Sequence, residues 1–305
     1  MADLTVDVAG LRLENPFILA SGVWGETGET LARALRAGAG AVVTKSIGPE
    51  PRAGYANPTV VEVPGGLINA MGLPNPGIDA YAEEVEAALK PGKPVIGSIF
   101  GADAGEFTTL ARRMEKLGVN ALELNLSCPH AKGYGAQLGQ DPDVTKRITA
   151  AVKAAVRIPV LVKLTPNVAS IPAIGKAAEE GGADAVCAIN TLKGMAIDLD
   201  LFRPVLSHGT GGYSGPGVKP VGLACVWELF EAVKIPIIGM GGISTGGDAA
   251  EYMLAGASAL QVGTAVYKKR DRTFRDLCRE LDRFLSARRY RSPRALIGKA
   301  HGGPA

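Results

Sequence analysis

The chain has 305 residues, of which 47% are hydrophobic and 21% charged, and its formal net charge is +3. These values suit a soluble protein with a large core, and the small net charge argues against a nucleic-acid-binding protein. The N-terminus lacks the features of a signal peptide and no apolar run reaches the length of a membrane span, so we expect a cytoplasmic protein. The four cysteines form no CxxC pair and lack metal-ligand spacing, so we expect no metal site.

Short apolar runs alternate with amphipathic stretches along the chain. Residues 5–13 alternate around Ala9-Gly10 and predict a hairpin that plugs the bottom of a barrel. Strands are predicted at residues 16–20, 41–44, 94–99, from 121 to a stop near Pro129, and at 159–164, 184–190, 236–240 and 259–262. Helices are predicted at residues 29–37, 78–89, 104–117, from Asp141-Pro142 onward, and at 171–180, 221–233, 246–254 and 272–287.

This order of elements predicts the fold class. Strands that are apolar on both faces are typical of parallel sheets, and eight strand–helix units in this length favour a closed (β/α)8 TIM barrel over a doubly wound sheet. No linker divides the chain, so we predict a single domain over residues 1–305. Two long loops, at 48–76 and 191–220, are expected at the C-terminal face, with a glycine-rich lid at 130–139.

The fourth strand ends at a cysteine. Its leucines alternate with Glu123 and Asn125, and Pro129 ends the sheet pairing just after Cys128. A thiol at a strand end can act as a nucleophile, redox partner or general base, although many free cysteines are inert and buried. The remaining cysteines fit the inert description, and they are Cys187, Cys225 and Cys278.

Two lysines, Lys45 and Lys163, each end an otherwise apolar strand. One such lysine can simply extend to solvent, but two that face one cavity would stabilise negative charge on a bound ring system such as a reduced flavin. The amides of Asn69, Asn125 and Asn190 are expected on the same rim, where they suit a planar heterocycle. By contrast, Asn75 and Asn167 are attributed to turn geometry.

Glycine turns follow the last two strands, at Gly241-Gly242 and Gly263-Thr264. Glycine lets backbone N–H groups approach a phosphate closely, and TIM barrels commonly bind phosphate at this place. Glycine turns also occur for backbone geometry alone, so the pattern by itself leaves both explanations open.

Several of these residues lie in longer motifs. The motifs are Ala20-Ser-Gly22, Thr44-Lys-Ser46, Asn69-Ala-Met-Gly-Leu-Pro-Asn-Pro-Gly77, Asn125-Leu-Ser-Cys-Pro129, Lys163-Leu-Thr-Pro166, Ile189-Asn-Thr191, Gly211-Gly-Tyr-Ser-Gly-Pro216, Gly239-Met-Gly-Gly242 and Gln261-Val-Gly-Thr264. Together they resemble the class 1 dihydroorotate dehydrogenase family over nearly the whole chain. Met195-Ala-Ile-Asp198 and Arg203-Pro-Val-Leu206 resemble the NAD-linked 1B type.

The resemblance implies FMN in the barrel mouth and oxidation of dihydroorotate to orotate in pyrimidine biosynthesis. The implied FMN-binding residues are Ser21, Lys45, Ser46, Ser98, Asn125, Lys163, Ile189, Gly215, Gly241, Gly242, Gly263 and Thr264. The implied substrate-binding residues are Lys45, Asn69, Ala70, Met71, Gly72, Leu73, Asn125, Asn190 and Thr191. The resemblance also implies that Cys128 is the general base for C5 of dihydroorotate, while hydride passes from C6 to N5 of FMN. Lys163 would stabilise charge near N1 and O2 of the reduced flavin.

The 1B resemblance implies a partner subunit that carries FAD and a 2Fe–2S cluster and passes electrons to NAD, in a heterotetramer around a homodimer of this chain. Three positions depart from the family pattern: His130 and Ser98 replace asparagines, and Tyr213 replaces a leucine. The Cys-Pro-His run also resembles the flavin domain of dihydropyrimidine dehydrogenase, which reduces uracil or thymine. That enzyme and a flavin-free phosphate-binding barrel are the alternatives; a barrel that only binds would leave both lysines and Cys128 without a task.

Overall fold

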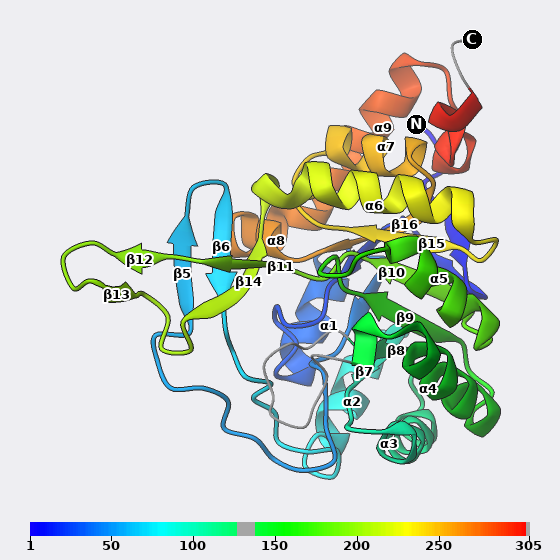
Figure 1. The fold of residues 1–305 in the computed structure, drawn as a ribbon. Coiled ribbons are helices and arrows are strands. Elements are labelled where there is room, and N and C mark those ends of the chain that lie inside the picture. Colours follow the sequence, from blue (N-terminus) through cyan, green and yellow to red (C-terminus); the bar gives the residue numbers. More distant parts are fainter. Residues whose placement is uncertain (127–137, 303–305) are drawn as a thin grey trace.

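The fold is built on eight parallel strands that close into a barrel (Figure 1). The structure, a computed structural model, describes residues 1–126 and 138–302. The strands follow one another around the barrel in chain order, and the last pairs with the first. They are β3 (Phe17–Leu19), β4 (Ala41–Val43), β7 (Val95–Ile99), β8 (Ala121–Asn125), β9 (Val160–Leu164), β10 (Ala185–Ala188), β15 (Ile237–Met240) and β16 (Ala257–Val262). The predicted (β/α)8 class is therefore confirmed.

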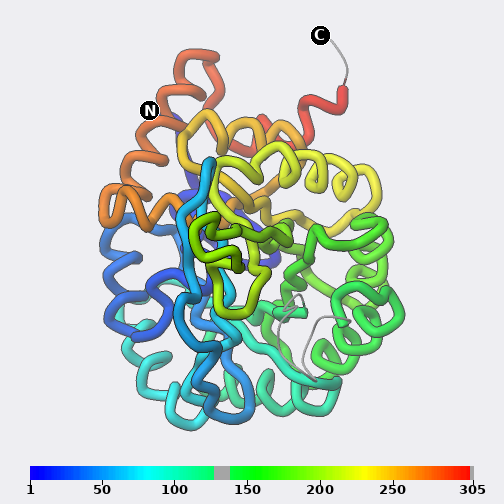
Figure 2. The backbone as a smooth tube through the Cα atoms, turned by 60° about the vertical axis from the view of Figure 1, so that its left-hand side comes forward, coloured from blue at the N-terminus to red at the C-terminus, as the bar shows by residue number. Residues whose placement is uncertain are grey.

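Helices surround the barrel and connect its strands (Figure 2). They are α1 (Gly28–Arg36), α2 (Ala82–Leu89), α3 (Ala104–Lys116), α4 (Pro142–Ala155), α5 (Ile171–Glu180), α6 (Lys219–Ala232), α7 (Gly246–Leu254), α8 (Thr264–Lys269) and α9 (Thr273–Ala287). The predicted helix start at Asp141-Pro142 is confirmed, since the Asp141 carboxylate accepts from the N–H groups of Asp143 and Val144. The predicted stop of α5 at Gly181 is also confirmed.

Some helical segments differ from the prediction. α2 begins at Ala82 rather than at residue 78, because residues 78–81 form turns anchored by the fully buried ring of Tyr81. The short α8 and the five 3-10 helices of the described residues were not predicted, since each has too few residues for a helical period to show. These 3-10 helices are η1 (Leu138–Gln140), η2 (Pro216–Val218), η3 (Arg270–Arg272), η4 (Pro293–Leu296) and η5 (Lys299–Gly302). No helix in the described ranges has the length and apolarity that crossing a membrane requires.

The predicted N-terminal hairpin closes one end of the barrel. Its strands are β1 (Val6–Val8) and β2 (Leu11–Leu13), joined by Ala9 and Gly10 in the left-handed region at φ of 51° and 78°. Two consecutive positive φ values suit the tight turns of antiparallel hairpins. The four apolar side chains of the hairpin pack in one cluster with the inward-facing residues of the barrel, such as Ile18 and Ala121. Because these residues lie at the N-terminal ends of the strands, the mouth is at the C-terminal ends.

The two long loops form a second sheet, which was not predicted from the sequence. Its strands lie in the order β11-β14-β6-β5, beside the barrel mouth (Figure 1). They are β5 (Val60–Val63), β6 (Gly66–Asn69), β11 (Leu192–Met195) and β14 (Thr210–Ser214); β12 (Ile197–Asp198) and β13 (Arg203–Pro204) form a separate projecting pair. Glycines interrupt the apolar pattern of β6, β11 and β14. The central β6–β14 pairing, which places Asn69 beside Gly212, joins segments far apart in the chain.

Candidate active site

One side of the barrel mouth carries a row of hydroxyl and amide groups centred on Ser46. Its Oγ lies 2.8 Å from Oγ of Ser98 and 3.2 Å from Oγ of Ser21. It also accepts a hydrogen bond from Nδ2 of Asn125 at 3.1 Å. These four residues come from the ends of four consecutive strands, β3, β4, β7 and β8. The structure therefore brings the predicted site residues of these strands together in one hydrogen-bonded row.

Lys45 follows β4 and lies just inside this rim. Its side chain is 11% exposed, and its Nζ is 3.4 Å from the carboxylate of Glu26, whose side chain is 75% exposed. An ion pair of this length with so exposed a partner is weak. The backbone is held more firmly, since the N–H of Lys45 donates to the Gly25 carbonyl at 3.2 Å. Lys45 thus keeps its charge at the mouth rather than extending it into solvent.

Gly25 and Tyr81 fix this segment. A Cβ at position 25 would lie 2.8 Å from the backbone N of Lys45, so the close approach requires glycine. The Tyr81 hydroxyl donates to the Gly25 carbonyl, and burial raises the pKa of this tyrosine well above its ordinary value. Tyr81 therefore stays a neutral hydrogen-bond donor that holds Lys45 in place.

The second lysine, Lys163, lies deeper in the barrel and has a buried partner. Its side chain is 5% exposed, and its Nζ is 3.4 Å from Oε1 of Glu123, whose side chain is 0% exposed. The other carboxylate oxygen accepts a hydrogen bond from Nε2 of Gln261 at 2.5 Å. Lys163 therefore does not extend to solvent. The roles of Glu123 and Gln261 beside it were not predicted from the sequence.

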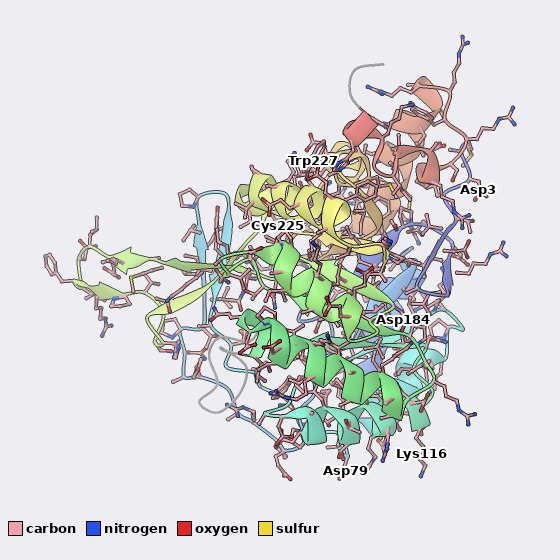
Figure 3. The ribbon with its side chains drawn as sticks, turned by 45° about the vertical axis from the view of Figure 1, so that its right-hand side comes forward. Asp3, Asp79, Lys116, Asp184, Cys225 and Trp227 are labelled. Atoms are coloured by element: carbon pink, nitrogen blue, oxygen red, sulfur yellow. The ribbon has the colours of Figure 1, made fainter. Side chains whose placement is uncertain are left out.

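The three cysteines in the described residues are free, and each is unsuited to act as a nucleophile. Cys187 is fully buried beside Gln261, and burial together with the charge of Glu123 raises its pKa well above the ordinary value. Burial also raises the pKa of Cys225 and of Cys278 to about 11 each. Cys225 lies on α6, outside the barrel (Figure 3). These thiols are therefore inert, as predicted.

Two of the predicted substrate residues, Asn69 and Thr191, meet at Gly212 of β14. Asn69 ends β6, and its Nδ2 donates to the Gly212 carbonyl at 3.3 Å. A Cβ on Gly212 would lie 2.1 Å from Oγ1 of Thr191, so that hydroxyl occupies the space above the glycine. Thr191 is held in turn, because its N–H donates to Oδ1 of Asn190 at 2.8 Å. Residues that are over a hundred positions apart in sequence are thus neighbours.

Asn167 does more than shape a turn. Its Nδ2 donates to the Thr191 carbonyl at 3.0 Å, and its Oδ1 accepts from the N–H of Lys193 at 2.9 Å. It therefore ties the loop after β9 to the start of β11 and fixes Thr191. Asn75 agrees with its assignment to turn geometry, since its Oδ1 accepts from the N–H groups of Gly48 and Gly77.

The glycine turns cluster on the opposite side of the mouth. Gly215, Gly241 and Gly242 have φ of 108°, 119° and 74°, values that disfavour any side chain. A Cβ on Gly242 would lie 2.8 Å from the Gly215 carbonyl, and one on Gly215 would lie 3.5 Å from Thr264. One on Gly241 would lie 3.4 Å from Ile189. The structure brings this group together, and close backbone packing explains why positions 215 and 242 are glycine.

Gly263 differs from those glycines. Its backbone has φ of −116°, and the nearest atom to a built Cβ is 3.7 Å away, on Ala20. Protein packing therefore does not require glycine at this turn, which lies where β16 meets the loop after β3. Beside it, Oγ1 of Thr264 lies 2.9 Å from Oγ of Ser214.

A half-buried ion pair stands behind the glycine turns. Nζ of Lys219 lies 2.7 Å from the carboxylate of Asp248 and 2.9 Å from that of Glu251. Burial alone would raise the pKa of Asp248, but hydrogen bonds from Lys219, Ser244 and Thr245 outweigh it and lower that pKa. The Asp248 carboxylate and the Thr245 hydroxyl also form the capping box of α7.

The proposed base, Cys128, and its neighbour His130 lie outside the described residues, as does most of the predicted lid. The flanking residues are described. Leu126 is buried just after β8, and a Cβ at Gly139 would lie 2.6 Å from the Leu126 carbonyl. The chain therefore leaves and re-enters the described part at the same place, beside Asn125 at the mouth.

The fold and the groups at its mouth define a TIM barrel of the enzyme type, with lysines, amides and glycine turns at the C-terminal ends of its strands. The family model for dihydroorotate dehydrogenase matches residues 3–285. The chain belongs to the dihydroorotate dehydrogenase family.

Individual relatives agree with this assignment. The chain is 54% identical over 297 residues to the "Dihydroorotate dehydrogenase B (NAD(+)), catalytic subunit" of Pyrococcus furiosus, covering 97% of this chain and 98% of that protein. It is 49% identical over 302 residues to the protein of the same name from Methanocaldococcus jannaschii, covering 98% of each. A crystal structure of DHODH from Eimeria tenella in complex with ferulenol superposes with a TM-score of 0.86 at 24% identity. It covers 98% of this chain and 89% of that one, and this likeness concerns the fold.

Proposed function

We propose that this chain catalyses the FMN-dependent oxidation of (S)-dihydroorotate to orotate in pyrimidine biosynthesis. The observation that carries the proposal is the match of residues 3–285 to the dihydroorotate dehydrogenase family, together with relatives near 50% identity that bear this name. The mouth residues support it, because Lys45 and a row of hydroxyl and amide groups lie there, above the buried Lys163.

The groups at the mouth fit FMN. The Ser21–Ser46–Ser98–Asn125 row would face the ring system, and the Lys163 ammonium would lie near its pyrimidine edge. Lys45 and Ile189 would complete the ring site. The phosphate would lie at the glycine turns, where Gly263 leaves open the space that a Cβ would fill; the other residues are Gly215, Gly241, Gly242 and Thr264. When bound, FMN would supply the acceptor for the hydride of C6.

The chain's own residues would then hold the substrate and move one proton. Lys45 carries the positive charge that a carboxylate substrate requires, and Asn125, Asn190 and Thr191 offer amide and hydroxyl groups. The segment from Asn69 to Leu73, with Ala70, Met71 and Gly72, would cover the substrate from the second sheet. Cys128, two positions after Leu126, would remove the proton from C5.

A thiol base predicts a particular pH dependence. Its ordinary pKa is about 8.5, so only a small fraction is thiolate at neutral pH. Turnover should therefore rise with pH through one ionisation, and Cys128→Ser should be slower yet regain some activity at high pH.

The names of the relatives also support the proposal of a partner subunit. They describe a catalytic subunit of an NAD(+)-dependent enzyme. We propose that this chain forms a homodimer and passes electrons to a second subunit with FAD and a 2Fe–2S cluster, as a heterotetramer that reduces NAD. The barrel with its second sheet would act as one catalytic domain over residues 1–305. The free cysteines in the described residues agree with a reducing compartment, and we propose the cytoplasm.

Turnover with an artificial electron acceptor tests the proposal. Wild-type protein should oxidise dihydroorotate and leave dihydrouracil untouched; Cys128→Ala should lose turnover by roughly 100-fold or more while it retains FMN. Cys225→Ala is the matched control, because that thiol lies on α6 outside the barrel. Unchanged turnover in Cys128→Ala would contradict the role of Cys128 as the base. Turnover of dihydrouracil alone would favour the dihydropyrimidine dehydrogenase alternative. A colourless protein that refuses FMN would favour a flavin-free barrel.

A further inference from the structure

A buried carboxylate lies at the centre of the barrel, directly below the mouth. Glu123 is on β8 and Gln261 is on β16, and three strands separate them in either direction around the barrel. Their side chains nevertheless meet, with Nε2 of Gln261 at 2.5 Å from Oε2 of Glu123. The contact therefore spans the barrel axis. Asn125, two residues further along β8, belongs to the rim, so Glu123 lies one layer beneath it.

Both oxygens of this carboxylate are occupied by donors. Oε1 lies 3.4 Å from the Lys163 ammonium, and Oε2 accepts from Gln261. Both glutamate and glutamine are at most 1% exposed. A carboxylate this far from water requires compensating donors, because its desolvation is costly. The lysine supplies the charge and the glutamine supplies the hydrogen bond.

The side-chain amide of Gln261 is oriented so that its N–H donor, and not its oxygen, faces the Glu123 carboxylate. Its Oε1 is buried and has no hydrogen-bond partner among the described residues. An unsatisfied buried carbonyl costs free energy that an apolar side chain of the same size would avoid. If the amide were reversed, its oxygen would face the Glu123 carboxylate. The observed orientation therefore serves the carboxylate.

Lys163 is the group that this arrangement fixes. A lysine side chain has a flexible four-carbon stem, so an unpaired ammonium has no single position. Its backbone is in register with Asn125 on the rim, while its Nζ is drawn to Glu123 in the layer below. Glu123 thereby decides both the place of the ammonium and how much of its charge is neutralised.

We propose that Glu123, held across the barrel axis by Gln261, is a positioning residue that sets how strongly Lys163 acts on the flavin. This inference rests on the proposed function. Because Glu123 places a negative charge beside the lysine, it lowers the net positive charge beneath the flavin. Replacing it by a neutral group of the same shape should favour the reduced, more negative flavin.

The reduction potential of bound FMN tests this. Glu123→Gln should raise it, with at least a tenfold gain in the affinity ratio of reduced over oxidised flavin, or about 30 mV for a two-electron couple. Lys163→Met should lower it. Glu123→Asp, which keeps the charge, should stay nearer the wild-type value than Glu123→Gln does. A second variant, Gln261→Met, removes the donor, leaves the carboxylate less neutralised and should lower the potential.

These opposite signs separate the proposal from a role in stability alone, which would leave the potential unchanged whatever happened to folding. A wild-type chain that binds FMN and has the same potential as Glu123→Gln would overturn this inference and leave the proposed function intact. If Glu123→Gln fails to fold, an unchanged or raised potential in Gln261→Met would overturn it. A wild-type chain that refuses FMN would overturn the proposed function and this inference with it.

Discussion

The two lysines of the barrel lie in contrasting surroundings. Lys163 is in the interior beside Glu123, a carboxylate with no exposed surface, whereas Lys45 is at the rim beside Glu26, whose side chain is 75% exposed. The N–O distance is 3.4 Å in both pairs. Burial, not distance, distinguishes them, since water screens one pair and not the other. We infer that Lys163 is tied to folding and flavin electronics, and that Lys45 remains available to a substrate anion.

The largest expected effect is on stability. Lys163→Met leaves Glu123 as an unpaired buried charge, which should lower the free energy of unfolding by about 3–5 kcal/mol. Urea denaturation measures this, and Lys45→Met is the matched control because its partner remains hydrated. The double variant Lys163→Met/Glu123→Gln removes both charges and should recover part of the loss. Equal losses of unfolding free energy in Lys163→Met and Lys45→Met would contradict the distinction between the buried and the exposed pair.

Lys45→Met should instead reduce catalysis. The loss of a charged hydrogen bond to the substrate costs about 1.5–3 kcal/mol, so kcat/KM for dihydroorotate should fall roughly 10- to 100-fold. Steady-state kinetics at saturating FMN measures this effect. If the variant had normal kcat/KM at saturating FMN but a raised Kd for FMN, Lys45 would serve the cofactor alone.

An ion pair of intermediate burial offers a pH test. Asp248 has a lowered pKa in the folded protein, so its carboxylate contributes stability above the unfolded value of 3.8, and this contribution disappears as pH falls through the folded pKa. Asp248→Asn also weakens the capping box of α7, so it should cost about 1 kcal/mol at pH 7. The difference between variant and wild type in thermal unfolding should shrink below pH 4. A difference that is constant with pH would refute the assignment.

The smallest effect should come from the rim pair. Glu26→Gln removes a mostly exposed carboxylate, so the free energy of unfolding should change by less than about 1 kcal/mol. Denaturation curves of this variant and of Glu123→Gln, run side by side, compare the two carboxylates directly. A loss at Glu26 as large as that at Glu123 would show that exposure does not separate the pairs.

The sequence predicts the barrel because its strands are local patterns. Runs such as residues 159–164 are apolar on both faces, and the Ala9-Gly10 turn marks the hairpin. The second sheet could not be predicted in this way. Its strands contain glycines such as Gly211 and Gly212, and each central strand finds its partner on the other long loop.

The candidate site likewise contains some residues that the sequence predicts and others that it does not. The sequence identifies Lys45, Asn125 and Lys163 because each is a polar residue at the end of an apolar strand. The role of Glu123 cannot be identified in the same way, because in the sequence it is one polar residue in an alternating run. Its partner Gln261 lies on the opposite strand of the barrel. The signal that could have revealed the role of Glu123 is a charged residue at an inward-facing position of a strand.

The central claim, oxidation of dihydroorotate by this barrel, is tested most directly by the reductive half-reaction of the isolated chain. Purified protein with FMN is mixed anaerobically with dihydroorotate, and the flavin absorbance is followed without any partner or acceptor. We predict loss of the oxidised flavin spectrum with one orotate formed per flavin, and no reaction with dihydrouracil. Bound FMN that stays oxidised in the presence of dihydroorotate would contradict it.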